Sequence, residues 1–316
     1  MRLLDSLLGG NRDGDDGEAD ARRAEDVARV EAGSIPLAAE RRLQELAAGS
    51  TGFTSGLSVA DFALCREAGV RPVAQVMGSS VYQVGWQNYP WNTGWQPGGL
   101  GFELETISEA WNRARALALG RLAEEASLAG CHAVVDVTFE NRRHEFLDNE
   151  IEIVVNGTAV VLDGAPPPAD KPVLTDLSMP DFVLLRRAGY DAVGVVAATS
   201  VLYLVPSAST QRLTSGLFHL TQSNQELTDY TVGLYAAREQ ALARANHEAW
   251  RSGATSVVGL WLDQHIAVRE VDQSGGKRED LIVTFHVIGT GIVQRGEHRP
   301  LEPGIQPVVR QGATRS

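Results

Sequence analysis

The chain has 316 residues, of which 43% are hydrophobic, and its formal net charge is −12. This composition can build two domains of ordinary size with buried cores, which excludes a globally disordered chain. Nucleic-acid binding depends on clustered Lys and Arg that displace counterions, so the acidic balance and the lack of a basic stripe argue against a nucleic-acid partner.

The start of the chain is typical of an intracellular protein. Its short apolar patch turns acidic at once, without a signal-peptide core or a cleavage site. No apolar run in the sequence reaches membrane-spanning length. Two cysteines, Cys65 and Cys131, are too few for a disulfide framework and suit a reducing compartment. We therefore expect a cytoplasmic protein without a transmembrane segment, in which residues 1–20 form a disordered acidic N-terminus.

Residues 21–50 are predicted to form a helical arm. The sequence ARRAEDVARVEAGSIPLAAERRLQELAA contains two charged helical stretches, interrupted between Gly33 and Pro36. Such an arm can be solvated, or it can clamp onto a protein partner or a second copy of the chain.

A repeat follows the arm. The stretch LSVADFALCREAGV at residues 57–70 recurs as LSMPDFVLLRRAGY at residues 177–190, at an offset of 120. The match resumes at offset 123 in the long helix and at offset 132 in the last strand. Because the offset grows only between predicted elements, where loops absorb insertions, the pattern predicts an internal duplication.

Each repeated unit begins with a short helix and a β-branched strand. Ser58 and Asp61 can cap the first short helix, and Gly69 can end it. In the second unit, Pro180 lies in the first helical turn, where its missing N–H costs nothing. A loop, a long helix and two further strands complete the unit.

The long helices are marked by apolar stripes with small residues, which allow a helix to lie close to a sheet. The stripes consist of Ile107, Trp111, Ala114, Ala118, Leu122 and Ala126 in the first unit and of Tyr230, Leu234, Ala237, Ala241, Ala245 and Ala249 in the second. Gly130 and Gly253 are expected to end these helices. Each unit is then a small, mainly antiparallel sheet with a long helix on one face, and its sheet edges need cover.

The motifs of the units resemble the YbjQ-like family, which carries a heavy-metal-binding label. The likeness rests on short motifs that recur in order, such as Ala114-Arg115, Gly130, Val134-Val135 and Gly157-Thr158 in the first unit. Ala237-Arg238, Gly253, Val257-Val258 and Gly289-Thr290 match them in the second. The resemblance implies a dodecin-like β-α-β-β core and ring-shaped homo-oligomers, usually pentamers. It implies no established activity, and it supplies no ligand set.

The predicted fold class is therefore α+β, with two tandem β-α-β-β units. We place the units at residues 51–163 and 173–295, joined by a Pro-rich linker at 164–172. Residues 296–316 are expected to form a disordered tail.

The candidate metal ligands do not form a motif. The chain has no CxxC, HxxxH or HxH, and Cys131 and His132 would point to opposite faces of a strand. We expect His247, His265 and His286 to be exposed or satisfied, and we predict no metal site, no other cofactor and no catalytic residue within one chain. A metal site shared between subunits stays open. The paired acids Glu124 and Glu125 are interpreted as solvated.

The segment GWQNYPWNTGWQPGGLGF holds three tryptophans and no charge, whereas its counterpart in the second unit is polar and has none. We predict that Trp86, Tyr89, Trp91 and Trp95 bind a ligand or a partner. A ligand bound there would be planar or sugar-like and would stack on the rings, and a docking surface could also face a membrane. The competing interpretation is that the loop only covers its own sheet or a neighbouring subunit.

Together these features favour a non-enzymatic, ring-forming scaffold or binding module. The alternative is a protein that binds a metal or a small ligand at unit or subunit interfaces. An enzyme ranks third, because the chain has no nucleophile elbow, Walker loop or dinucleotide-binding glycine motif.

Overall fold

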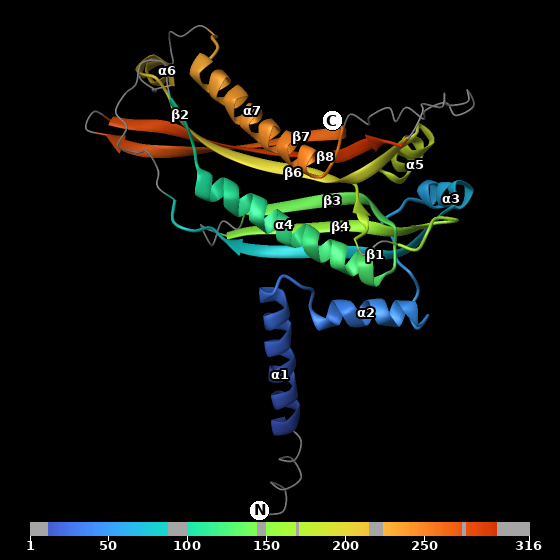
Figure 1. Cartoon of the computed structure of the whole chain (residues 1–316). Coiled ribbons are helices and arrows are strands. Elements are labelled where there is room, and N and C mark those ends of the chain that lie inside the picture. Colours follow the sequence, from blue (N-terminus) through green and yellow to red (C-terminus); the bar gives the residue numbers. More distant parts are fainter. Residues whose placement is uncertain are drawn as a thin grey trace, which may run out of the picture.

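The computed structural model describes residues 12–87, 100–143, 150–168, 171–214, 224–273 and 276–295. These segments form helices and two four-stranded sheets, which confirms the predicted α+β class (Figure 1). The first sheet contains, in spatial order, β1 (Val70–Gln83), β4 (Glu150–Leu162), β3 (Ala133–Arg143) and β5 (Val173–Leu174). The second sheet contains, in spatial order, β2 (Leu100–Glu103), β6 (Tyr190–Val205), β8 (Gly276–Gln294) and β7 (Ser256–Gln273). Neighbouring strands in these sheets are antiparallel except for β3 with β5.

The short helix that opens each repeated unit begins where the sequence predicts. The helices are α1 (Arg12–Glu31), α2 (Leu37–Ala47), α3 (Val59–Ala68), α4 (Glu105–Leu128), α5 (Met179–Arg187), α6 (Ala208–Thr214) and α7 (Thr228–Arg251). Ser58 and Asp61 form a reciprocal capping box at the start of α3, and Gly69 ends that helix with φ +66°. The side chain of Ser178 caps α5, and Pro180 lies in its first turn.

The two long helices pack on their sheets through the predicted alanine stripes. Ala114, Ala118 and Leu122 of α4 are fully buried in a core shared with β1 and β4. A Cβ atom at Gly78 of β1 would lie 2.0 Å from the carbonyl oxygen of Ala118, so this close approach requires glycine. Four buried alanines of α7 pack in the same way on β6 and β8: Ala237, Ala241, Ala245 and Ala249.

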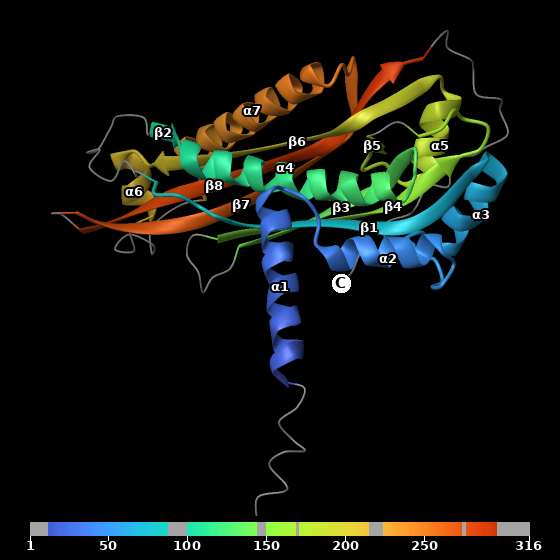
Figure 2. The ribbon, with the colours of Figure 1, turned by 60° about the horizontal axis from the view of Figure 1, so that its bottom comes forward.

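Helix α4 lies between the two sheets, whereas α7 covers the other face of the second sheet (Figure 1, Figure 2). Helix α4 contacts β1 and β4 of the first sheet and β6 of the second. Val201 and Tyr203 of β6 share a buried cluster with Trp111 of α4. The alternate residues Leu202 and Leu204 belong to the cluster beneath α7. One hydrophobic core therefore joins the two halves of the chain.

The two sheets have corresponding strand orders, β1-β4-β3 and β6-β8-β7, and corresponding irregularities. The strand register shifts between Pro72 and Ala74 in β1 and between Ala192 and Gly194 in β6. A second pair of shifts contains the positive-φ residues Asp136 in β3, at 55°, and Gly259 in β7, at 66°. These positions differ by 120 and 123 residues, the offsets of the sequence repeat. Duplication of the unit remains a prediction. An internal duplication would give the two sheets matching strand orders and matching irregularities of this kind.

The arm is held by acids that the sequence does not mark as buried. Helix α1 projects from the body, and α2 lies beside α4 (Figure 2). Glu124 accepts a hydrogen bond from the Ser34 side chain. Glu125 is 3% exposed; it accepts from the N–H of Met77 at 2.9 Å and pairs with Arg42 at 2.9 Å. The prediction that these acids are solvated is wrong, because the arm and the edge of β1 supply partners from distant sequence.

Some boundaries differ from expectation. Helix α1 begins at Arg12, so helical structure starts within the segment expected to be disordered, 1–20. Strand β2 and helix α6 are additional elements that the repeat pattern does not predict. The described part of the linker, 164–168 and 171–172, has no helix or strand, and the predicted tail 296–316 lies outside the described residues.

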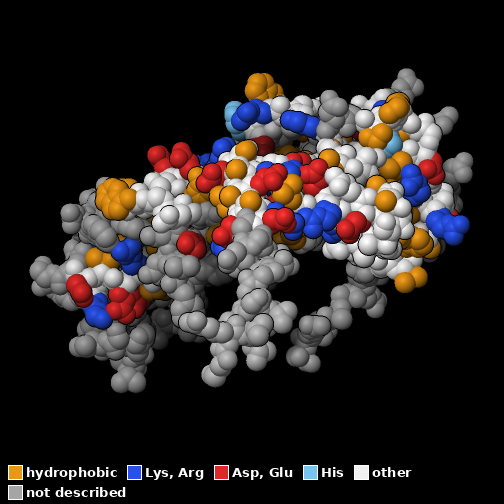
Figure 3. All heavy atoms as spheres, turned by 90° about the horizontal axis from the view of Figure 1, so that it is seen from below, with side chains coloured by type: hydrophobic (Ala, Val, Ile, Leu, Met, Phe, Trp, Pro, Cys, Tyr) orange, Lys and Arg blue, Asp and Glu red, His pale blue; other side chains and the backbone are white. Residues whose placement is uncertain are grey.

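Charged side chains of both signs are visible on one face of the molecule. On the face seen in Figure 3, acidic and basic side chains of the described residues are interspersed, and the basic ones form no continuous stripe.

Candidate functional site: the contact between the two halves

The second sheet includes a strand from the first half of the chain. Leu100 of β2 lies opposite Val205 of β6, and Glu103 lies opposite Leu202. The N–H of Leu104 then donates to the carbonyl of Val201 at 2.8 Å, directly before α4 begins. The first half therefore covers an edge that β6 would otherwise leave open.

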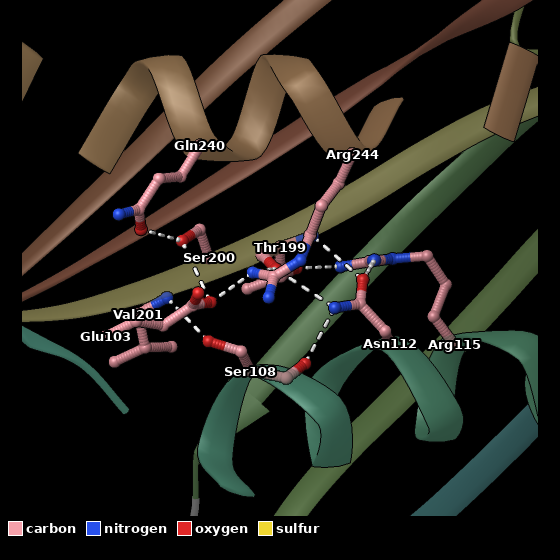
Figure 4. A network of polar contacts seen from close by, with 9 residues as sticks. All are labelled: Glu103, Ser108, Asn112, Arg115, Thr199, Ser200, Val201, Gln240 and Arg244. Carbon is pink, nitrogen blue, oxygen red and sulfur yellow. Dashed lines mark hydrogen bonds and ion pairs between the residues drawn. The ribbon is translucent and has the colours of Figure 1, made fainter. Parts of the chain in front are cut away.

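Side chains of α4 continue this pairing along β6 (Figure 4). Ser108 Oγ accepts from the N–H of Val201 at 2.9 Å. Asn112 satisfies both backbone groups of Thr199: its Oδ1 accepts from the N–H at 2.9 Å, and its Nδ2 donates to the carbonyl at 2.9 Å. A helix thus takes the place of a neighbouring strand. A buried backbone group left without a partner there would cost about 1–3 kcal/mol.

Helix α7 joins the same network from the other side (Figure 4). Arg244 of α7 forms an ion pair with Glu103 at the end of β2. Ser200 Oγ lies 3.1 Å from Gln240 Oε1 and 3.4 Å from Glu103 Oε1. These contacts link β2, β6 and α7, so the junction is held by charge as well as by backbone pairing.

Arg115 is a buried cation at the centre of this contact. It is 2% exposed; its Nη1 donates to Asn112 Oδ1 at 3.1 Å, and its Nη2 donates to the hydroxyl of Thr199. Its Nη2 also lies 3.4 Å from Nδ1 of His286, whose ring meets the edge of Trp111 at 4.8 Å between centroids. Among the described residues, nothing bonds its Nε.

Burial determines the charge states of these groups. Burial lowers the pKa of Arg115 to about 10, and the charge of Glu248 acts in the opposite direction, so the guanidinium is charged at pH 7. Burial, followed by the charge of Arg115, lowers the pKa of His286 to about 3. His286 is therefore neutral at pH 7, and its Nδ1 lies 2.8 Å from the hydroxyl of Thr199.

An open cleft of about 790 Å³ adjoins the network, between α4 and α7 and above β6. Its lining includes Arg115, Arg244 and Arg251, together with the carboxylate of Glu248. Guanidinium groups present planar donors that suit carboxylates and phosphates. The cleft can therefore hold a small anion.

The four histidines within the described residues are satisfied or exposed, as the sequence predicts. His132 bonds to two backbone groups at 2.7 and 3.1 Å, His286 is buried in the contact, and His247 and His265 are exposed. Within the described segments, no group of three or more His, Cys, Asp or Glu could hold a metal ion. Burial raises the pKa of Cys131 to about 12, which makes its thiol unreactive at neutral pH.

One of the predicted binding residues can be placed. Trp86 is 83% exposed, just beyond the end of the edge strand β1. Tyr89, Trp91 and Trp95 lie outside the described residues. The binding role of this set remains a prediction, and Trp86 lies where it is accessible to a partner.

The polar residues of the contact were missed by sequence reasoning. Asn112 and Thr199 belong to no recognisable motif, because their roles depend on a contact between distant segments. A signal did exist for Arg115, since the Ala-Arg pair recurs as Ala237-Arg238. Arg115 is buried and Arg238 is exposed. The arginine of this pair is therefore buried only in the first unit, where the second half of the chain docks on it.

Comparisons with known families and proteins place the chain among relatives. Residues 99–163 match the model of the YbjQ family, described as "Putative heavy-metal-binding". The encapsulin nanocompartment protein Rv1762c of Mycobacterium tuberculosis (strain ATCC 25618 / H37Rv) is 32% identical over 272 residues, which cover 85% of this chain and 94% of that protein. No solved structure matches. None of the helices in the described segments has the length and apolarity to cross a membrane.

Proposed function

The chain belongs to the family of the encapsulin nanocompartment protein Rv1762c, and we propose that it is a non-enzymatic scaffold or binding module of a protein compartment in the cytoplasm. The name of that relative refers to a compartment and not to a reaction. The observation that carries the proposal is the docking of β2 and α4 on the edge of β6, because this contact is built to join one unit to another.

The scaffold is proposed to be a homo-oligomeric ring of tandem units. The YbjQ match supports this arrangement, since the resemblance implies rings that are usually pentamers. The projecting helix α1 and the exposed Trp86 are the surfaces through which a protein partner is proposed to bind. Both are accessible to a partner.

The compartment role can be tested in the organism that encodes the chain. The full-length protein, carrying a small C-terminal tag, should sediment in a density gradient with particles far heavier than its own 34.0 kDa. An unrelated cytoplasmic protein with the same tag serves as the control. Recovery of the tagged chain only in the low-mass fractions would contradict the compartment role.

A second candidate function, favoured by the arginine-lined cleft, is the binding of a small anion between the units. Arg115, Arg244 and Arg251 face a cleft that also contains Glu248, so the lining carries an excess of positive charge. The expected ligand is a phosphate or a small carboxylate, because these match the planar fork of a guanidinium.

Calorimetric titration with inorganic phosphate tests this candidate. Arg251→Gln should weaken binding about tenfold or more, which corresponds to the loss of one charge-assisted hydrogen bond. Arg238→Gln removes an exposed arginine from the same helix outside the cleft and should leave binding unchanged. Equal effects of the two substitutions, or no heat from millimolar phosphate, would exclude the anion site.

A further inference from the structure

We infer that the free end of β1 receives residues 224–227 and the start of α7 from a second copy of this chain. The contact would repeat, between copies, the one that β2 and α4 make with β6 inside the chain. This inference rests on the proposed scaffold function and specifies the contact that builds it.

The two donor segments share the backbone geometry of the residue that precedes the helix. Leu104 precedes α4 with φ −90° and ψ 78°, and Leu227 precedes α7 with φ −87° and ψ 81°. Each follows a glutamate, Glu103 or Glu226, and each begins a helix of 24 residues. Inside the chain Leu104 is 1% exposed, because it packs against β6. Leu227 is only half-buried, and residues 224–226 before it are exposed.

The receiving strands also correspond, but only one of them is occupied. Val201 of β6 is 1% exposed, and its N–H and carbonyl bond to Ser108 and Leu104. Its counterpart, Val81 of β1, is 64% exposed. The alternation of an antiparallel ladder directs the N–H and carbonyl of Val81 away from β4. Among the described residues, no hydrogen bond reaches them from that side.

The arm and α4 cover the edge of β1 only up to the start of this free stretch. Arg42 of α2 donates to the carbonyl of Gln75 at 3.1 Å, and Arg121 of α4 donates to the carbonyl of Ser79. Beyond Ser79, none of the described strands pairs with residues 81–83 on this side, and an edge of this kind is a template for pairing with another chain.

The exposed side chains are complementary as well. Tyr235, at the position in α7 that Asn112 occupies in α4, is 65% exposed. On β1, both Met77 and Val81 are exposed on the face away from α4. An exposed apolar surface on one helix and another on a distant strand fit a contact between two copies.

The proposed contact is head-to-tail. Each copy presents one donor segment before α7 and one receiving edge on β1, so every added copy exposes a new edge. Such a heterologous contact closes into a ring if the rotation between copies allows it, and otherwise forms an open filament.

Disulfide trapping tests the register. Phe102 lies opposite Tyr203 inside the chain, and the corresponding positions are Gln225 and Gln83. We expect a mixture of Gln83→Cys and Gln225→Cys proteins to form a covalent dimer after mild oxidation with diamide. Glu67→Cys, an exposed site on α3, replaces Gln83→Cys in the control mixture. Dimer formation no faster than in the control would overturn the inference.

A matched pair of substitutions separates this inference from the scaffold proposal. Val81→Arg should weaken assembly of the full-length chain about tenfold or more, because it places an unpaired charge in the contact. Val268→Arg alters a valine of similar exposure, 61%, on β7 and should leave assembly intact. If the wild type and Val81→Arg assemble equally well, the inference fails and the scaffold stands. If the wild type does not assemble, both fail.

Discussion

At the residue scale, Gly78 is the position where α4 and the first sheet approach most closely. A Cβ atom there would lie 2.0 Å from Ala118 O and 2.6 Å from Leu122 N, and backbone atoms cannot move aside. Gly78→Ala should lower the free energy of unfolding by about 1–3 kcal/mol. Gly120 is an exposed residue of α4, and a Cβ atom added there would have no neighbouring atom within 4 Å. Gly120→Ala should therefore raise the free energy of unfolding by about 1 kcal/mol. Urea denaturation measures both, and equal shifts would contradict the close packing.

His286 should make stability depend on pH. Its pKa is lowered from 6.5 to about 3, so between these values the unfolded chain binds a proton that the folded chain does not. Stability therefore falls as pH decreases from about 6.5 towards 3. His286→Gln should reduce the slope of melting temperature against pH in this window. Replacement of the exposed His247, which is not among the groups that lower the pKa of His286, is the control, and an identical slope in His286→Gln would show that His286 is not buried as described.

At this scale, the sequence predicts what depends on neighbouring residues. Ser58, Gly69 and Pro180 are correctly assigned because caps and turns are set by a few consecutive residues. Glu125 and Arg115 are not correctly assigned, because their burial depends on segments far away in sequence. The arm covers Glu125, and β6 covers Arg115. Polarity on a helix face cannot show which distant segment covers it.

At the scale of elements, Asn112 should be the main polar link between α4 and β6. Asn112→Ala removes the partner of the Thr199 N–H and the nearer donor to its carbonyl, which Arg244 also reaches at 3.4 Å, so it should lower the free energy of unfolding by about 1–3 kcal/mol. Arg113→Ala changes the next residue, which is exposed. Its free energy of unfolding should stay within about 0.5 kcal/mol of the wild-type value. Similar thermal shifts for both variants would contradict the proposed edge contact.

The attachment of the arm can be tested separately. Glu125→Ala removes the carboxylate that pairs with Arg42 and accepts from the Met77 N–H, so α2 should detach more easily. Limited proteolysis should cut between α1 and α2 several times faster than in the wild type. Glu45→Ala, at an exposed site on α2, is the control. Cleavage at the wild-type rate in Glu125→Ala would mean that Glu125 does not hold the arm.

Elements with strong periodicity are predicted well, and their pairing is predicted less well. The alanine stripes of α4 and α7 and the three main strands of each half lie where the repeat places them. Strand β2 is different, because its four residues carry little periodicity and pair with β6 about a hundred positions away. Alignment of the two halves shows that they are alike but not that one half completes the sheet of the other.

At the scale of the whole molecule, the central claim is that the chain assembles with copies of itself. Native mass spectrometry of the full-length protein at micromolar concentration tests this claim most directly. The account predicts one or more species at integer multiples of 34.0 kDa, with the monomer a minor component. A spectrum that shows only a 34.0 kDa species under conditions that preserve non-covalent complexes would contradict it.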